Sequence, residues 1–194
     1  MNKQRKISGA ALFMYSAIVV TAVMAATCFT LYYGKIFAHA AILWIGITTF
    51  MILFHFGLRI LFGEVTKRIK IDYRHPWFRR RGFERALFRL LRVRQWKAKV
   101  LTFDTAAYDF ENRTPAQLAA TMAKSETDHW INEIISLVSI LFALVWGQVA
   151  IIVGTAILAM LFDAQFIIVQ RYNRPIVLRL MEKQQNARQK IKAH

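Results

Sequence analysis

The sequence predicts an all-α polytopic membrane protein, with four transmembrane helices in two hairpins and a cytosolic amphipathic, interfacial helical segment between them. Three observations predict this fold. The 194 residues are 56% hydrophobic, two long blocks are almost free of charge, and the Lys and Arg residues gather outside those blocks. Such a composition excludes intrinsic disorder and exceeds what a water-soluble domain of this size buries easily.

The first predicted hairpin joins crossings at about residues 9–33 and 36–62. The apolar run that begins at Ile7 has no charged residue up to Tyr33, and at about 1.5 Å per residue it spans a hydrocarbon core of about 30 Å. The second run carries one formal charge, Arg59, whose long side chain we expect to reach the headgroups. A cleaved secretory signal peptide is the alternative interpretation of the N-terminus.

The second predicted hairpin lies in the apolar block Ile131–Val169. One helix crosses a membrane with about 20 residues, so a block of this length fits two crossings. The turn is expected at Trp146–Gln148, which places the crossings at about 130–146 and 149–170. The single cysteine, Cys28, is interpreted as a packing residue, because a lone cysteine builds no disulfide framework.

Charge placement predicts the orientation. All 27 Lys and Arg residues except Lys35 fall on one side of the four crossings. The positive-inside rule then places both termini, the segment at about 63–129 and the basic tail 171–194 in the cytosol. We expect residues 1–194 to form one integral, multi-pass domain in a cell membrane, with anionic lipids of the cytosolic face as partners. The net charge of +16 reports this topology, so no nucleic-acid partner is expected.

A basic amphipathic pattern lies between Arg81 and Lys99 in the cytosolic segment. One helical face carries apolar residues, and arginines occupy the other. The apolar residues are Phe83, Leu87, Leu90 and Leu91. This pattern is typical of an interfacial helix, in which each basic residue near an anionic leaflet contributes about 1 kcal/mol. A second interpretation is that these cations also hold an anionic group of a substrate, such as a phosphate.

A helix that begins at the capping sequence Thr114–Gln117 is expected to run from the cytosol into the third crossing. It carries Glu126, His129 and Glu133 on one face, near the membrane boundary. A histidine flanked by carboxylates is a suitable general base. In the alternative interpretation, His129 and Trp130 are interfacial anchors. No metal site is expected, because a di-iron bundle needs a second Glu-x-x-His motif.

The fourth crossing ends in polar residues. Asp163 lies about two turns inside the membrane boundary, where an acid usually faces the interior of a helix bundle. The cluster that follows consists of Gln170, Arg171, Tyr172, Asn173 and Arg174. We expect Pro175 to end it. Both polar clusters fall on the cytosolic side, so we expect one site, with His55 as either a further lining residue or a packed polar residue.

Three strings carry a family resemblance, within about Phe83 to Arg179. They are Val93-Arg94-Gln95-Trp96-Lys97-Ala98-Lys99, then Glu126-x-x-His129-Trp130-Ile131, then Ile167-Ile168-Val169-Gln170-Arg171-Tyr172-Asn173-Arg174-Pro175. In this order and spacing they resemble the glycosyl-4,4'-diaponeurosporenoate acyltransferases, small bacterial membrane proteins of staphyloxanthin-type carotenoid biosynthesis. The resemblance implies an enzyme that moves a fatty acyl group onto a sugar hydroxyl of a glycosylated, membrane-embedded isoprenoid.

The chain departs from the family pattern at two places. Asp163 and Gln165 stand where the family tends to have Asn and Pro, and Ile176 stands where it tends to have Arg. These departures leave the identity of the lipid-linked acceptor open.

The residue pattern and the resemblance together predict acyl transfer, with His129 as general base and Glu126 orienting it. The expected substrate-binding residues are Trp96, Lys97, Trp130, Glu133, Asp163, Gln170, Arg171, Tyr172, Asn173 and Arg174. Among them, Arg171, Asn173 or Arg174 is expected to stabilise the oxyanion or to bind phosphates of the donor. No tightly bound cofactor is expected; the co-substrate is an acyl thioester of coenzyme A or of an acyl carrier protein. The alternative is a non-enzymatic lipid-binding or lipid-translocating protein.

Overall fold

The computed structural model describes residues 9–100, 105–109 and 111–192, and over these residues it contains helices and no β-strand. The predicted all-α class is therefore confirmed. Four helical stretches are long and apolar enough to cross a membrane, as predicted: Gly9–Tyr33, Ala40–Thr66, Pro115–Trp146 and Val149–Ile191.

Within the described residues the chain forms seven α-helices and four short 3-10 helices. The α-helices are α1 (Gly9–Tyr33), α2 (Ala40–Thr66), α3 (Glu84–Leu90), α4 (Val93–Trp96), α5 (Pro115–Ser139), α6 (Ala143–Trp146) and α7 (Val149–Lys192). The 3-10 helices are η1 (Pro76–Phe78), η2 (Lys97–Lys99), η3 (Thr105–Tyr108) and η4 (Ile140–Phe142).

The chain divides into two compact units. Unit 1 comprises Met1–Arg68 and Trp130–Asp163, and unit 2 comprises Ile69–His129 and Ala164–His194. The long helices α5 and α7 each contribute residues to both units.

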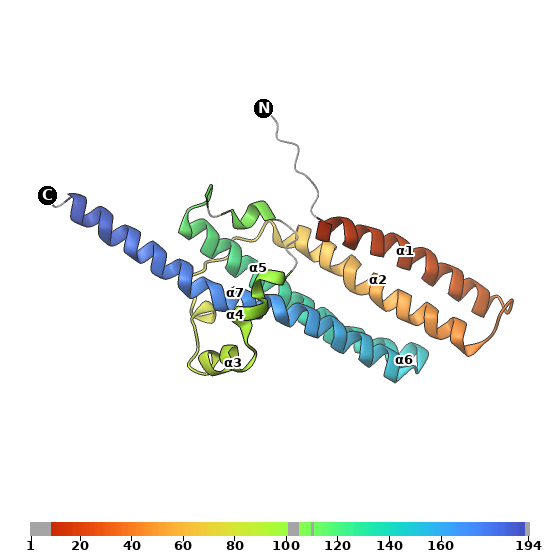
Figure 1. Cartoon of the computed structure of the whole chain (residues 1–194). Coiled ribbons are helices and arrows are strands. Elements are labelled where there is room, and N and C mark those ends of the chain that lie inside the picture. The colour runs from red at the N-terminus through yellow and green to blue at the C-terminus, as the bar shows by residue number, and fades with distance from the viewer. Residues whose placement is uncertain (1–8, 101–104, 110, 193–194) are drawn as a thin grey trace, which may run out of the picture. The chain divides into compact units, whose positions relative to one another are not determined.

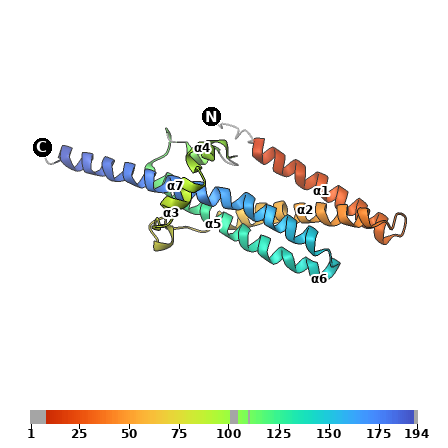
Figure 2. The same ribbon diagram turned by 60° about the horizontal axis from the view of Figure 1, so that its bottom comes forward.

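In unit 1, α1 and α2 lie side by side and antiparallel (Figure 1 and Figure 2). The two helices approach closely at Gly46, where a Cβ atom would lie 3.1 Å from Cβ of Cys28 and 3.2 Å from the ring of Phe29. Cys28 therefore packs in the contact between the helices, in agreement with its interpretation as a packing residue. α2 begins at Ala40 rather than at residue 36, because His39 Nδ1 accepts a hydrogen bond from the first turn and caps the helix.

The core of unit 1 combines aliphatic and aromatic side chains. The buried residues at its centre are Ile47, Met51 and Ile152. Trp146 stacks on Phe29 with ring centroids 5.5 Å apart, a favourable arrangement for two aromatic rings. The turn predicted at Trp146–Gln148 is present, since Gly147 adopts a left-handed φ of 65° and ends α6.

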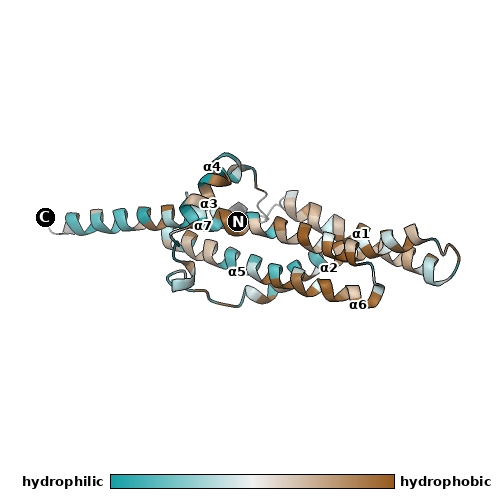
Figure 3. Ribbon diagram, turned by 90° about the horizontal axis from the view of Figure 1, so that it is seen from below, coloured by the Kyte–Doolittle hydropathy of each residue, from teal (hydrophilic) through white to brown (hydrophobic). Residues whose placement is uncertain are grey.

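Apolar side chains also cover the outside of the long helices. Figure 3 shows hydrophobic residues along α1, α2 and α6, whereas the C-terminal part of α7 is hydrophilic. Leu144 is 86% exposed and Leu158 is 68% exposed. Extended apolar surface of this kind is unfavourable in water and suits the lipid hydrocarbon. The chain is a membrane protein.

A buried ion pair lies in unit 1 where the sequence indicated a headgroup contact. Arg59 Nε donates to Asp163 Oδ2 at 3.1 Å, and Arg59 Nη2 forms an ion pair with the same oxygen. Asn132 Nδ2 donates to the other carboxylate oxygen at 3.0 Å. The interpretation of Arg59 as a residue that reaches the headgroups is wrong, because its guanidinium group pairs with a carboxylate that has no exposed surface.

In unit 2, the first part of α5 packs against the second part of α7. The predicted capping box is present: the Gln117 N–H donates to Thr114 Oγ1 at 3.3 Å, and the Thr114 N–H donates to Gln117 Oε1 at 2.9 Å. The buried core consists of Leu118, Ala119, Met122 and Val177. The predicted long helix is confirmed, because α5 runs without a break from Pro115 to Ser139.

The amphipathic helix predicted between Arg81 and Lys99 is interrupted. α3 ends at Leu90, and Arg92 adopts a left-handed φ of 49° before α4 begins. The buried residues of this segment are Glu84, Phe88 and Val93, whereas the expected apolar face is exposed at Phe83 and Leu90. The face differs because the carboxylate at the start of α3 turns inward to an arginine of α7. The interfacial role of the exposed apolar residues stays a prediction.

Pro175, which follows the polar cluster of the fourth crossing, does not end the helix, because α7 continues through it to Lys192. Proline lacks an N–H group, so the carbonyl of Arg171 loses its helical donor. The helix continues because the residues on both sides are fixed by packing: Arg174 and Val177 are buried in unit 2.

We expect Arg59→Ala to lower the free energy of unfolding of unit 1 by about 3–5 kcal/mol, because it leaves a buried carboxylate without its cation. Removing both charges, in Arg59→Met with Asp163→Leu, should recover most of this loss. Reversible unfolding in mixed mild and denaturing detergent micelles measures both changes. The matched control, Lys67→Ala, breaks the exposed Glu64–Lys67 pair and should change little. Equal losses in Arg59→Ala and Lys67→Ala would contradict a role for the buried pair.

Candidate active site

Glu126 of α5 is the centre of the polar cluster in unit 2. Its side chain is fully buried. Oε1 accepts from Arg171 Nη1 at 2.6 Å, and Oε2 forms an ion pair with Arg174 Nη2. Arg171 also donates from Nε to Oε1 of Glu84 at 2.7 Å. Two carboxylates and two guanidinium groups therefore balance one another inside the unit, which offsets the cost of removing these charges from water.

The same two arginines hold the loop that precedes α3. Arg174 Nη1 donates to the carbonyl of Phe78 at 3.0 Å, and its guanidinium group lies 4.8 Å from the centroid of the Phe78 ring. Arg171 donates to the carbonyls of Trp77, at 3.4 Å, and of Arg79, at 3.3 Å. The loop around η1 is thus attached to α7 through its own backbone carbonyls.

His129 follows Glu126 by one helical turn on α5 and is half-buried. Its imidazole stacks on Phe166 of α7, with ring centroids 4.4 Å apart and planes 3° from parallel. This contact fixes the plane of the imidazole. Because the two rings stack face to face, the imidazole nitrogens lie on the ring edge and not on the face that contacts Phe166. Both oxygens of Glu126 are bound by arginines. That Glu126 also orients His129 stays an expectation.

A second cluster joins Lys97 to the end of the fourth crossing. Lys97 Nζ donates to Asn173 Oδ1 at 2.6 Å and lies 4.7 Å from the centroid of the Tyr172 ring. Partial burial, and then the like charge of Arg94, lowers the pKa of the Lys97 ammonium group. The Tyr172 ring meets Phe88 edge to face, with centroids 5.5 Å apart. Two strings far apart in the sequence therefore meet in one place.

The remaining expected residues of unit 2 have structural contacts. Gln170 Nε2 donates to Tyr108 Oη at 3.0 Å and to Ser125 Oγ at 3.3 Å, which joins α7 to η3 and α5. The Trp96 indole N–H donates to the carbonyl of Leu91 at 2.8 Å and closes the turn between α3 and α4.

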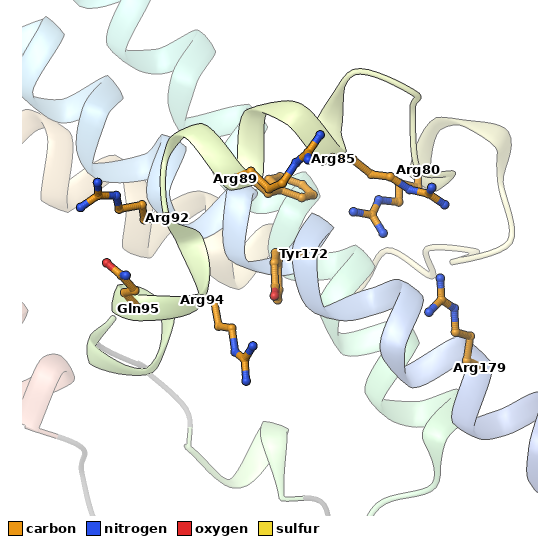
Figure 4. A pocket seen from close by; sticks show the side chains of 9 residues that line it. Arg80, Arg85, Arg89, Arg92, Arg94, Gln95, Tyr172 and Arg179 are labelled. Carbon is orange, nitrogen blue, oxygen red and sulfur yellow. The ribbon is translucent and has the colours of Figure 1, made fainter.

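A pocket of about 700 Å³ is lined by residues of α3, α4 and α7 and of the segments beside them. Its arginines are Arg80, Arg85, Arg89, Arg92, Arg94 and Arg179. Phe88, Gln95 and Tyr172 complete the lining, and Figure 4 shows Tyr172 among the guanidinium groups. None of these arginines forms an ion pair with a carboxylate of the described part of the chain. Within the described residues, no carboxylate therefore compensates the positive charge of this pocket.

Three expected site residues belong to unit 1 instead. Asp163 is bound by Arg59 and is fully buried, Glu133 is half-buried, and Trp130 is 40% exposed. His55 of α2 is also buried in unit 1, and neither of its ring nitrogens has a hydrogen-bond partner among the described residues. Whether these residues share a site with the cluster of unit 2 stays an expectation.

Sequence reasoning missed several residues of the cluster. They are Glu84, Tyr108, Ser125 and Phe166. Glu84 carried a signal, because it is the only acid between Arg79 and Lys99 and a lone carboxylate among arginines is a natural partner for one of them. The other three carried none, since only the packing of α5, η3 and α7 brings them to their partners. In the described residues, no group of three or more His, Cys, Asp or Glu is placed to hold a metal ion.

Comparison with known proteins places this cluster in a family. The sequence profile of the glycosyl-4,4'-diaponeurosporenoate acyltransferases matches residues 74–183, more than half of the chain. The match contains Lys97, Glu126, His129 and the cluster 170–174. No curated protein and no solved structure matches the chain significantly. The match favours an enzyme over a lipid-binding or lipid-translocating protein. The chain therefore belongs to the glycosyl-4,4'-diaponeurosporenoate acyltransferase family, and it is a membrane-bound acyltransferase.

Proposed function

We propose that the chain transfers a fatty acyl group from a thioester donor to a sugar hydroxyl of a membrane-embedded, glycosylated isoprenoid, with His129 as general base. The family description names a glycosylated carotenoid acid as the molecule that is acylated. Four helices are apolar enough to cross a membrane, in which such an acceptor is dissolved. The departures from the family pattern at Asp163, Gln165 and Ile176 concern the acceptor, so the exact isoprenoid is left open.

The observation that carries the proposal is the setting of His129. The imidazole is half-buried, its plane is fixed by Phe166, and it lies one turn from the fully buried charge cluster of Glu126 within the segment that matches the family. A general base needs a fixed orientation and limited access of water, and this setting supplies both.

In the proposed reaction, the acceptor hydroxyl gives its proton to an imidazole nitrogen of His129 while its oxygen attacks the thioester carbonyl carbon. The new C–O bond forms a tetrahedral oxyanion, which collapses with cleavage of the C–S bond. The leaving thiolate takes the proton back from the imidazolium, so the base is regenerated. Transfer is direct in this scheme, because Ser125 is engaged by Gln170 and Cys28 packs in unit 1.

The cations of the site take separate roles in this proposal. Arg171 and Arg174 are engaged by two carboxylates and by backbone carbonyls, so we assign them and Glu126 to positioning α5 against α7. Lys97, held by Asn173, is the partly buried cation that we assign to stabilising the oxyanion. No tightly bound cofactor takes part in the scheme.

The proposed setting is a cell membrane, with both termini and the arginine-rich segment in the cytosol and anionic lipids at that face. The support is the charge distribution, since Lys35 alone of the Lys and Arg residues falls on the other side of the four crossings.

We expect His129→Ala to lower kcat by about 10²- to 10⁴-fold, because the variant removes the general base. The assay measures acyl transfer from a radiolabelled thioester to the extracted acceptor by the purified, membrane-inserted protein. His39→Asn is the matched control, because His39 lies in the turn before α2 and Asn retains its capping role; it should keep full activity. Near-normal transfer by correctly folded His129→Ala would show that another group is the base.

The orientation is tested by cysteine labelling in a Cys28→Ser background. A cysteine at Lys35 should react with a membrane-impermeant maleimide added to intact cells, whereas a cysteine at Arg188 should react only after the membrane is opened. The reverse pattern would place the termini outside. Labelling of both positions in intact cells would contradict an even number of crossings.

A further inference from the structure

We propose that the arginine pocket of unit 2 binds the phosphate-bearing nucleotide end of a coenzyme A thioester, which makes acyl-coenzyme A the acyl donor. This inference rests on the proposed acyl transfer and names its donor. It concerns residues that take no part in the proposed chemistry at His129.

The positive charge of the pocket favours a ligand with phosphate groups. The six arginines of the pocket are exposed and have no carboxylate partner in the described chain, whereas the neighbouring Arg171 and Arg174 each form an ion pair with Glu126. Coenzyme A carries a diphosphate and a 3′-phosphate at its nucleotide end, with about four negative charges at neutral pH. Guanidinium groups bind phosphate oxygens in pairs, which makes arginine the residue of choice for this ligand.

The volume and the lining of the pocket suit a nucleotide. The pocket of about 700 Å³ falls within the range of about 300–1,000 Å³ that is usual for small-molecule sites. Tyr172 and Phe88 add aromatic surface to the cationic lining, which suits contact with a purine base. This open, cationic site offers partners to both the phosphates and the base of a nucleotide.

The backbone of the pocket is also unusual. Arg92 adopts a left-handed conformation with a φ of 49°, which is unfavourable for a residue with a Cβ atom. Glycine would avoid this cost, yet the position carries an arginine that lines the pocket. Residues in sparsely populated backbone conformations concentrate at ligand sites.

The arginine pocket adjoins the proposed site of acyl transfer through residues of α7. Tyr172 lines the pocket and also lies under Lys97, whose ammonium group binds Asn173. Arg171, the residue before Tyr172, binds Glu126 one turn from His129. A flexible pantetheine arm separates the thioester from the phosphates, so the pocket holds the donor by one end while the thioester reaches the site of transfer.

Calorimetry tests the proposal. It measures the binding of adenosine 3′,5′-bisphosphate, a fragment without an acyl group, to the purified full chain in a neutral-lipid nanodisc. We expect the bisphosphate to bind and coenzyme A to compete with it. Dephospho-coenzyme A, which lacks the 3′-phosphate, should compete with an affinity about 10-fold lower than that of coenzyme A. Arg85→Ala with Arg89→Ala should weaken binding about 100-fold, at about 10-fold per lost phosphate contact. Arg85→Lys with Arg89→Lys keeps the charge and guards against a folding defect; it should weaken binding by less.

The matched control is Arg188→Ala, an exposed arginine of α7 outside the pocket, which should leave binding unchanged. Three results would overturn the proposal: no binding to the wild type, equal weakening by Arg188→Ala and the double Ala variant, or pocket-dependent binding of anionic vesicles or an acyl carrier protein with which the bisphosphate does not compete. His129→Ala should bind the bisphosphate normally. Normal binding with unimpaired transfer by His129→Ala would refute the general base and leave the donor site standing.

Discussion

Unit 2 depends on one constraint, the complete burial of the Glu126 carboxylate. A carboxylate removed from water loses several kcal/mol of hydration, so it is tolerated only with close cationic partners. Arg171 and Arg174 of α7 supply them, and Arg171 brings in Glu84 as well. The register of α5 against α7 follows from this pairing, since a shift by one residue would leave a buried charge without a partner. His129, one turn further along α5, therefore meets Phe166 rather than another residue of α7.

The same pairing organises the arginine-rich segment. Because Arg171 and Arg174 also bind the backbone carbonyls of the loop around η1, the chain enters α3 at a defined place, and Glu84 faces inward. The unpaired arginines of α3 and α4 then remain on the surface of unit 2, around Tyr172. Arginines paired with carboxylates thus build the scaffold, and we propose that those without a carboxylate partner in the described residues bind a ligand. Unit 1 uses the same principle on a smaller scale, with Asp163 bound by Arg59.

Periodicity and charge were enough to predict the helical class, the four apolar crossings, the turn at Gly147 and the start of α5, because each depends on local properties of the chain. Sequence-based predictions were wrong where a contact with a residue distant in the sequence determines the position of a side chain. Arg59 was assigned to the headgroups because a sequence does not display its partner, and the amphipathic face of α3 was misjudged because an ion pair outweighed an apolar stripe. Sequence reasoning singles out Glu126, Arg171 and Arg174 of the charge cluster, but it missed both Glu84 and the pairing of Glu126 with the two arginines.

In the proposed function, this member of the family uses His129 to place an acyl group on a membrane-embedded glycosylated isoprenoid. The most direct measurement is mass spectrometry of the lipids of cells that produce the wild-type chain, His129→Ala or no chain. We expect one lipid to gain the mass of one acyl group in cells with the wild-type chain and to lack this gain in the other two. Identical lipid profiles in all three, with the protein present in the membrane, would contradict it.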